Sequence, residues 1–343
     1  MRGKRFFAAS NTSRGFVSYF AENFRERADR CYIIKGGPGT GKSRLMSEMA
    51  DAFCDSGGDV EYYFCSSDPT SLDGLFVKCD GYSVAVVDGT APHAEDIYYP
   101  GVKDNIIDVG RFWDPRILRE AKNEINLFTG RKSRAYSSAY RALAAYGALR
   151  ELSDALAAEA ADAGVIADQC ARLAEELPHG RLLRTPLSAV GMRGRVDYDS
   201  FSESAELTLT ITDSRAYGIS HLYFDRLVAA IGGRAAPDPI LPSRYTAMMA
   251  GGVAVKDAYV GNAGGGAIDV SEFVDRSLYL MNKERIDRLR LLADSALAEA
   301  LDFFAEAGEA HMNIEKIFAS AMNFGEKEAY SSELCDKIRK GYL

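Results

Sequence analysis

The chain has 343 residues and a formal net charge of −8, with 47% hydrophobic and 26% charged residues. This length suits one large domain or two smaller ones, each with a sizeable core. The acidic balance argues against a general nucleic-acid binder, and no apolar run approaches the ~18 residues that a membrane span needs. The six cysteines show no C-x-x-C pair and no metal-ligand spacing, which predicts a reduced, cytoplasmic protein.

The most informative stretch is G-G-P-G-T-G-K-S at 36–43, which fits the phosphate-binding pattern G-x-x-x-x-G-K-[ST]. An apolar run at 31–34 predicts a buried strand before it, and apolar residues spaced four apart predict a helix over 44–53 behind it. Glycines let the backbone N–H groups turn inward around a phosphate, and the start of the helix adds its positive dipole end. The stretch therefore predicts a nucleoside-triphosphate site.

The roles within this loop follow from the chemistry of phosphate binding. Lys42 is expected to reach the β- and γ-phosphates, and the hydroxyl of Ser43 to ligate Mg²⁺. ATP and Mg²⁺ are the expected cofactors, although the base preference stays open because no guanine-specific N-K-x-D signature occurs. The residues expected to contact the nucleotide are Gly37, Pro38, Gly39, Thr40, Gly41, Lys42, Ser43 and Arg44.

Two further strands are predicted at 60–65 and 82–87, and Asp88 directly follows the second of them. Small apolar residues followed by an acid form the Walker B pattern, in which the carboxylate holds Mg²⁺ directly or through water. Asp88 is therefore predicted to be a catalytic residue and a metal ligand together with Ser43.

The group that activates the attacking water is not settled by the sequence. Many P-loop ATPases carry a glutamate directly after this acid, where this chain has Gly89. The candidates are Asp68, His93, Glu95 and Asp96, with Asp68 and Glu95 preferred as catalytic residues. They follow predicted strands at the edge where open α/β sheets bind ligands.

A long helical block is predicted from Asp114-Pro115 to about Glu176, with breaks near Gly130 and Gly164. The block contains a basic cluster made by Arg131, Lys132 and Arg134. Two interpretations are open for this cluster. It is either a solvated helix face or a kinase-style lid that swings over the γ-phosphate.

The second half of the chain repeats the first at two places. R-G-F-V-S-Y at 14–19 is echoed by R-G-R-V-D-Y at 193–198, and I-D-V-G-R-F-W-D at 107–114 by I-D-V-S-E-F-V-D at 268–275. Each copy of the second motif leads into a long helical segment. These echoes predict a tandem duplication, an internal pseudo-dimer that is compatible with a monomeric protein.

The second copy is expected to have lost the nucleotide site. Its equivalent strand is 207–211, and in its equivalent loop, 213–220, Asp213 replaces the first glycine and Ile219 replaces the lysine. A carboxylate in this place without a lysine repels phosphate.

The metal ligand of the second copy is expected to be missing as well. The third strand of the copy is predicted at 258–260, where it ends on Gly261 rather than on an acid. Most of the loop that corresponds to 90–101 is expected to be missing too. This joint loss predicts that the 91–100 loop of the first copy belongs to the nucleotide site.

The first half resembles a family of bacterial P-loop ATPases that carry two tandem P-loop domains. The motifs that carry the resemblance are N-T-S-R-G-F at 11–16, I-I-K-G-G-P-G-T-G-K-S at 33–43, C-S-S-D-P-T-S-L-D-G at 65–74 and V-D-G-T-A-P-H at 87–93. Members of the family are similar in having a second intact P-loop, which this chain lacks. The resemblance therefore implies one live site beside a structural pseudo-domain.

Together these patterns predict an α/β fold with a P-loop NTPase-type parallel sheet, flanked by helices and duplicated. The predicted parts are an active domain at 1–114, its helical segment at 115–180, a degenerate domain at 181–275 and a C-terminal helical segment at 276–343. The expected function is a slow or regulated ATPase with an unidentified protein or small-molecule partner. The alternatives are a small-molecule kinase and a nucleotide-dependent switch or scaffold with little turnover.

Overall fold

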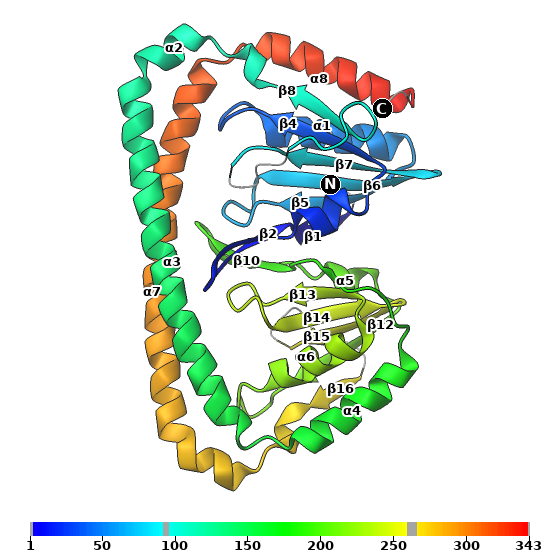
Figure 1. Cartoon of the computed structure of the whole chain (residues 1–343), viewed down its shortest axis with the longest axis vertical. Coiled ribbons are helices and arrows are strands. Elements are labelled where there is room, and N and C mark those ends of the chain that lie inside the picture. The colour runs from blue at the N-terminus through cyan, green and yellow to red at the C-terminus, as the bar shows by residue number, and fades with distance from the viewer. Residues whose placement is uncertain (1–2, 92–95, 259–265, 342–343) are drawn as a thin grey trace.

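The computed structural model describes residues 3–91, 96–258 and 266–341, and the fold is α/β. Two six-stranded sheets lie one above the other, and two long helices run along one side of both (Figure 1). Each sheet packs a helix that follows its phosphate-loop position, α1 (Lys42–Asp55) in the first and α6 (Ser220–Ile231) in the second.

The first sheet is mixed, so the prediction of a parallel sheet is wrong in part. The strand β6 runs antiparallel to both of its neighbours, whereas the other neighbouring pairs are parallel. No strand is expected from the sequence pattern between 65 and 82, where β6 lies. In sheet order the strands are β1 (Lys4–Phe7), β5 (Asp59–Phe64), β6 (Leu72–Cys79), β7 (Tyr82–Asp88), β4 (Arg30–Lys35) and β8 (Asp104–Asp108).

The second sheet repeats the first strand for strand, with one antiparallel strand at the same place in the order. In the corresponding order its strands are β9 (Leu183–Arg184), β13 (Arg234–Pro237), β14 (Tyr245–Ala250), β15 (Val253–Asp257), β12 (Leu207–Thr212) and β16 (Ala267–Asp269). The prediction of two similar halves is confirmed.

Both sequence echoes fall on equivalent elements. The first lies on the hairpins β2–β3 (Ala9–Thr12 and Gly15–Ser18) and β10–β11 (Ser188–Gly191 and Gly194–Asp197). The second lies on the short 3₁₀ turns η2 (Gly110–Phe112) and η3 (Val270–Phe273). The short helices η1 (Ala21–Arg25) and α5 (Ser200–Ser204) also follow the hairpins at equivalent points.

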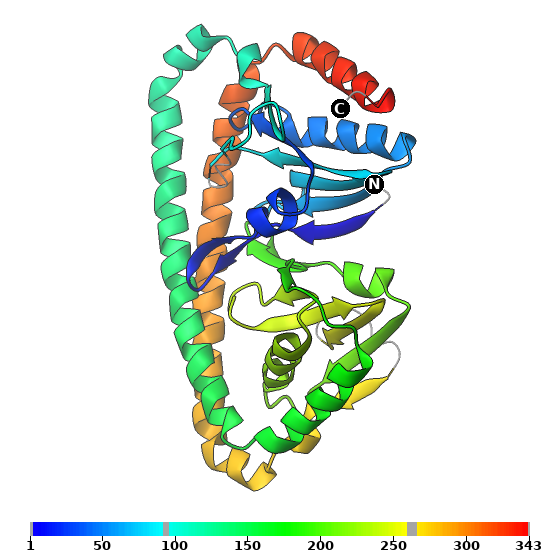
Figure 2. The ribbon, with the colours of Figure 1, turned by 45° about the vertical axis from the view of Figure 1, so that its right-hand side comes forward.

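The two long helices connect the halves, each running from one half to the other. After α2 (Pro115–Glu120), α3 (Lys122–Ala158) leaves the first half and ends near the second, where α4 (Ala163–Glu176) joins the second core through Ile166 and Cys170. In return α7 (Arg276–Ser320) leads to α8 (Phe324–Arg339), which joins the first core through Leu334 and Ile338. Figure 2 shows α4 beside the second sheet and α8 beside α1. The halves therefore exchange their terminal helices.

The hairpins are exchanged in the same way. The N–H of Met192 donates to the carbonyl of Ser67 at 3.1 Å, and the N–H of Ser13 donates to the carbonyl of Ile240 at 2.9 Å. Each bond joins the hairpin tip of one half to a loop of the other half. This loop follows β5 in the first half and β13 in the second. Such reciprocal contacts are what a twofold relation between two copies produces.

Of the two helix breaks expected from the sequence, one is wrong and one is confirmed. Gly130 does not break the helical block, since α3 passes through it from Lys122 to Ala158. A helical glycine costs only about 1 kcal/mol, and the packing of α3 along α7 outweighs that cost. The break near Gly164 is confirmed, because α3 ends at Ala158 and α4 begins at Ala163.

No helix among the described residues is both long enough and apolar enough to cross a membrane. All six cysteines are free thiols.

Candidate functional site

The glycine-rich loop lies at the carboxyl end of β4, where α1 begins at Lys42. Gly39 and Gly41 have φ angles of +71° and +76°, which favour glycine because a side chain would clash with the backbone. The hydroxyl of Thr40 donates to the carbonyl of Gly37 at 2.9 Å and ties the turn together. This backbone shape turns successive N–H groups toward the centre of the loop.

Two of the predicted site residues, Lys42 and Asp88, meet at this edge of the sheet, and Ser43 is next to Lys42 in the chain. The Nζ of Lys42 lies 3.6 Å from the Oδ2 of Asp88, and it donates to the carbonyls of Gly36 and Gly37 at 2.9 and 2.7 Å. The Oγ of Ser43 accepts a hydrogen bond from the N–H of Leu72 at 2.9 Å. The lysine and the acid therefore lie close together, and the serine follows the lysine in the first turn of α1.

Asp88 is held in a buried position at the end of β7. Its Oδ1 accepts hydrogen bonds from the N–H and the hydroxyl of Thr90, at 2.9 and 2.5 Å. Burial raises the pKa of Asp88 above its ordinary value, although Lys42 and Thr90 act in the opposite direction. A second buried carboxylate, Asp73 on the unpredicted strand β6, acts on Asp88 electrostatically. Asp73 is not predicted from the sequence because its strand, β6, is not predicted either.

Helix α7, which starts beside the second sheet, covers the glycine loop of the first. A Cβ placed on Gly39 would lie 2.4 Å from the carbonyl oxygen of Glu315, and one placed on Gly37 would lie 3.1 Å from the Trp113 ring. The Gly41 position faces the Lys327 side chain of α8 at 3.6 Å. The surroundings of the loop thus come from both halves of the chain, which no local sequence pattern could indicate.

A group of half-buried charges surrounds this contact. Burial and Asp68 raise the pKa of Glu315, while burial lowers the pKa of His311 to about 4. Burial also lowers the pKa of Lys132, which lies in the electrostatic range of Glu315. Lys42 acts on both Glu315 and His311. Lys132 of the predicted basic cluster therefore lies in the electrostatic range of Glu315 and His311 of α7.

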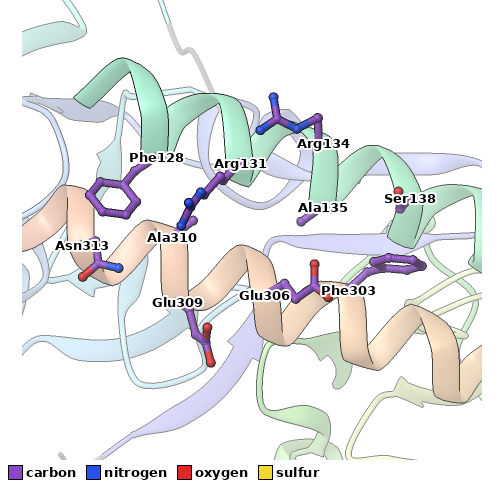
Figure 3. A pocket seen from close by; sticks show the side chains of 10 residues that line it. All are labelled: Phe128, Arg131, Arg134, Ala135, Ser138, Phe303, Glu306, Glu309, Ala310 and Asn313. Carbon is purple, nitrogen blue, oxygen red and sulfur yellow. The ribbon is translucent and has the colours of Figure 1, made fainter. Parts of the chain in front are cut away.

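Arg131 and Arg134 lie elsewhere. Both line an open groove between α3 and α7, together with Glu306 and Glu309 (Figure 3). This groove is separate from the set of residues around Lys42. The interpretation of the whole cluster as a lid over the γ-phosphate is therefore not supported for these two arginines.

The candidates for a general base are distributed unevenly. His93 and Glu95 lie outside the described residues. Asp96 lies at an exposed position, and its backbone carbonyl accepts a hydrogen bond from Arg25. Asp68 forms an ion pair with the Nε of Arg193 at 2.9 Å. Burial would raise the pKa of Asp68, but the bonds from Arg193 and Thr70 lower it below its ordinary value, which makes this carboxylate a weak base.

The equivalent loop of the second half has kept the backbone shape. Gly218 has φ +80°, and Ala216 has φ +55°, a left-handed value that is unusual for a residue with a side chain. The carboxylate of Asp213 fills the loop and accepts hydrogen bonds from the N–H groups of Tyr217, Gly218 and Ile219, at 3.0, 2.5 and 3.3 Å. The prediction that a carboxylate occupies this place is confirmed.

The expected loss of the metal acid in the second half is wrong. The third strand of the copy is β15, not 258–260, and it ends on Asp257. Ile211 pairs with Asp257 just as Ile34 pairs with Asp88, so the two acids are equivalent. Asp257 accepts a 2.5 Å hydrogen bond from the hydroxyl of Ser220. The error arose because V-A-V-K-D interrupts the apolar run with a lysine, which is buried here and paired with Asp199.

This correction also weakens the inference about the 91–100 loop. Asp257 follows Asp88 by 169 positions and Ile268 follows Ile107 by 161, so the second copy is eight residues shorter between these points rather than twelve. The shortening no longer accompanies the loss of the acid. Only the lysine and the open glycine position are lost.

Replacing Asp213 by alanine is expected to lower the free energy of unfolding by about 2–3 kcal/mol, because three N–H groups lose a charged acceptor. Urea unfolding of the purified protein measures the change. Asp213→Asn, which keeps an acceptor, should lose less than the alanine variant. Equal stability of wild type and Asp213→Ala would contradict the role given to this carboxylate.

Comparison with known proteins adds no relative. The chain matches no family model, no curated protein and no solved structure. The resemblance to tandem P-loop ATPases thus rests on the motifs quoted above, and functional conclusions rest on the site itself.

Proposed function

We propose that residues 36–43 bind the phosphates of ATP and that the first half hydrolyses it at a single site. The observation that carries this proposal is the second loop, where the same backbone shape holds an anionic carboxylate on three N–H groups. In the first loop Gly36 stands at the position of Asp213 and has no side chain to fill that space. The first loop is therefore suited to an anion from outside the chain.

Two further features support a nucleotide rather than a simple anion. Lys42 lies at the start of α1, where its cation and the helix dipole both favour the β- and γ-phosphates. Its present bonds go to the loop carbonyls and its pair with Asp88 is loose at 3.6 Å. A phosphate offers this cation stronger charge-assisted bonds.

The donor set also fits magnesium. A hydroxyl and a carboxylate, from Ser43 and Asp88, are the oxygen ligands that Mg²⁺ takes alongside phosphates and water. When bound, the ion neutralises charge that develops on the phosphate oxygens. Asp88, with its pKa raised by burial, would gain a cation that favours its ionised form. Lys42 remains free to follow the γ-phosphate.

Among the described carboxylates near the loop, Glu315 fits the task of orienting the attacking water better than Asp68 does. Glu315 has a raised pKa, which strengthens it as a base. Asp68 has a lowered pKa because Arg193 and Thr70 stabilise its charged form. Glu95 stays a prediction from the sequence, since it lies outside the described residues.

A second function, a nucleotide-dependent switch, is favoured by the position of α7. This helix touches Gly39 through Glu315 and begins at the second sheet, so a nucleotide that shifts the glycine loop would move a helix shared by both halves. Binding with no phosphate release under any condition would favour the switch over the ATPase.

The test compares wild type with Lys42→Ala by calorimetric titration of ATP in the presence of Mg²⁺. Loss of a charge-assisted bond costs about 1.5–3 kcal/mol, so the variant should bind roughly ten- to a hundredfold more weakly. Lys78→Ala, at an exposed lysine near the end of β6, is the matched control and should bind as wild type does. If neither wild type nor control binds ATP, or if Lys42→Ala binds equally well, the proposed site is wrong.

A further inference from the structure

The tip of the β10–β11 hairpin belongs to the second half but rests against the first. A Cβ on Gly191 would lie 2.5 and 2.6 Å from the carbonyl oxygens of Ser66 and Ser67, so the hairpin backbone is in direct contact with the loop at 66–71. The N–H of Met192 donates to Ser67, and Met192 also packs against Gly308 of α7. These contacts fix the direction of the next residue, Arg193.

The same loop reaches the glycine-rich site at its other end. Leu72, which directly follows the loop, donates its N–H to the Oγ of Ser43 at 2.9 Å. Within the loop, the N–H of Ser71 donates to the carbonyl of Asp68 at 2.9 Å. Arg193, bound to the carboxylate of Asp68, is therefore separated from the proposed magnesium ligand only by this short turn.

An equivalent arginine occupies the other half. Arg14 follows Ser13 at the tip of β2–β3, as Arg193 follows Met192, and it extends to Ser243, in the loop after β13, and to Glu151 of α3. Ser13 packs against Gly147 of α3 just as Met192 packs against Gly308 of α7. Each hairpin thus presents one arginine across the twofold relation to the loop of the opposite half. The loop that Arg193 contacts is bonded through Leu72 to Ser43 of the glycine-rich loop with its lysine, whereas the equivalent glycine-rich loop of the second half, 213–220, has Ile219 in place of the lysine.

We propose that Arg193 is a trans-acting arginine of the first site, which leaves Asp68 and binds the γ-phosphate oxygens in the transition state of ATP hydrolysis. The proposal rests on the proposed function. Asp68 is then the resting partner of the guanidinium rather than the base. The ion pair is suited to exchange, since the Arg193 side chain is 54% exposed and an exposed pair contributes little stability.

Arg193 forms no covalent bond during the reaction. The water oxygen bonds to the γ-phosphorus while the bond to the β–γ bridging oxygen breaks, and that electron pair leaves with ADP. The water proton passes to the released phosphate or to solvent. Arg193 donates N–H bonds to the oxygens on which charge is spread, and a planar guanidinium does this in a bidentate way that lysine cannot match.

The experiment compares Arg193→Ala with Arg14→Ala in the full chain, through three quantities. These are kcat for phosphate release, Kd for ATP with Mg²⁺, and Kd for ADP with Mg²⁺ and aluminium fluoride, which mimics the transferring phosphoryl group. For Arg193→Ala we expect kcat and affinity for the mimic to fall about 10²-fold while ATP affinity stays within about threefold. Arg14→Ala should match wild type in all three, and Arg193→Lys should not restore kcat.

Each other outcome overturns the proposal. If Arg193→Ala and Arg14→Ala behave alike, the arginine has no catalytic part. If Arg193→Ala weakens ATP and the mimic equally, it serves ground-state binding or folding only. If wild type and Arg14→Ala bind ATP but release no phosphate, the arginine inference fails while the binding site stands. If wild type binds no ATP, the proposed function itself fails.

Discussion

Glu61→Gln is expected to lower the free energy of unfolding by about 3–5 kcal/mol, because it leaves buried charges without their partner. The Glu61 carboxylate accepts bonds from Arg27 at 2.9 Å and from Arg234 at 2.7 and 3.2 Å, and Tyr63 donates to it as well. Without this carboxylate, two guanidiniums that cannot lose their protons would face each other between the sheets. Urea unfolding measures the loss.

The same substitution should also change how the stability depends on pH. Burial would raise the pKa of Glu61, but Arg234 and Arg27 outweigh it and lower the pKa from 4.5 to about 2. A lowered folded-state pKa contributes stability that is complete above the unfolded value. The difference between wild type and Glu61→Gln should therefore be full above about pH 4.5 and shrink as the pH falls toward 2.

The control for this variant is Glu333→Gln, the same substitution at a surface pair. Glu333 is 62% exposed and pairs with Lys337 at 2.7 Å, so its loss should leave the stability close to that of the wild type. If Glu61→Gln were no worse than this control, the buried cluster would not be holding the two halves together.

The position of this pair explains why the halves had to differ. Glu61 on β5 pairs with Phe76, and Arg234 on β13 pairs with Met249 at the equivalent register, so Glu61 and Arg234 are equivalent residues that contact each other. Two identical copies would place like charges at this point. A duplicated chain can place a carboxylate against a guanidinium, which a symmetric homodimer cannot do with one sequence.

The sequence carried the local parts of this structure well. The pattern around 36–43 located the strand, loop and helix, and the acid that it singled out, Asp88, ends β7 at 3.6 Å from Lys42. The repeated R-G and I-D-V motifs predicted two similar halves. Each motif forms the same local turn in both copies, a hairpin tip for R-G and a short 3₁₀ turn for I-D-V. These features depend on neighbours in the chain, which periodicity and turn chemistry reflect.

The parts that failed depend on residues far apart in sequence. Asp257 was missed because the buried Lys256 interrupts an apolar pattern, and the pairing with Asp199 that permits this burial is visible only in three dimensions. Glu315 and Arg193 come to the first site through the exchange of a helix and a hairpin. No pattern within α7 or the hairpin states which half each will contact.

The two equivalent acids allow the sharpest test of the proposed chemistry. Asp88→Asn is expected to lower the rate of phosphate release at saturating ATP by about 10³-fold, since a magnesium ligand worth several kcal/mol in the transition state is lost. The variant should also require more Mg²⁺ for half-maximal rate. Single-turnover phosphate release over a range of Mg²⁺ concentrations measures both effects.

Asp257→Asn provides the matched control in the second half. It removes the same carboxylate from the same strand position, but its loop has Ile219 in place of the lysine and holds Asp213 where a phosphate would bind. Its rate should therefore equal that of wild type, once its folding is verified by thermal unfolding. A comparable loss in both variants would mean that the acid supports the sheet edge in each half, and the assignment of Asp88 to magnesium would have to be abandoned.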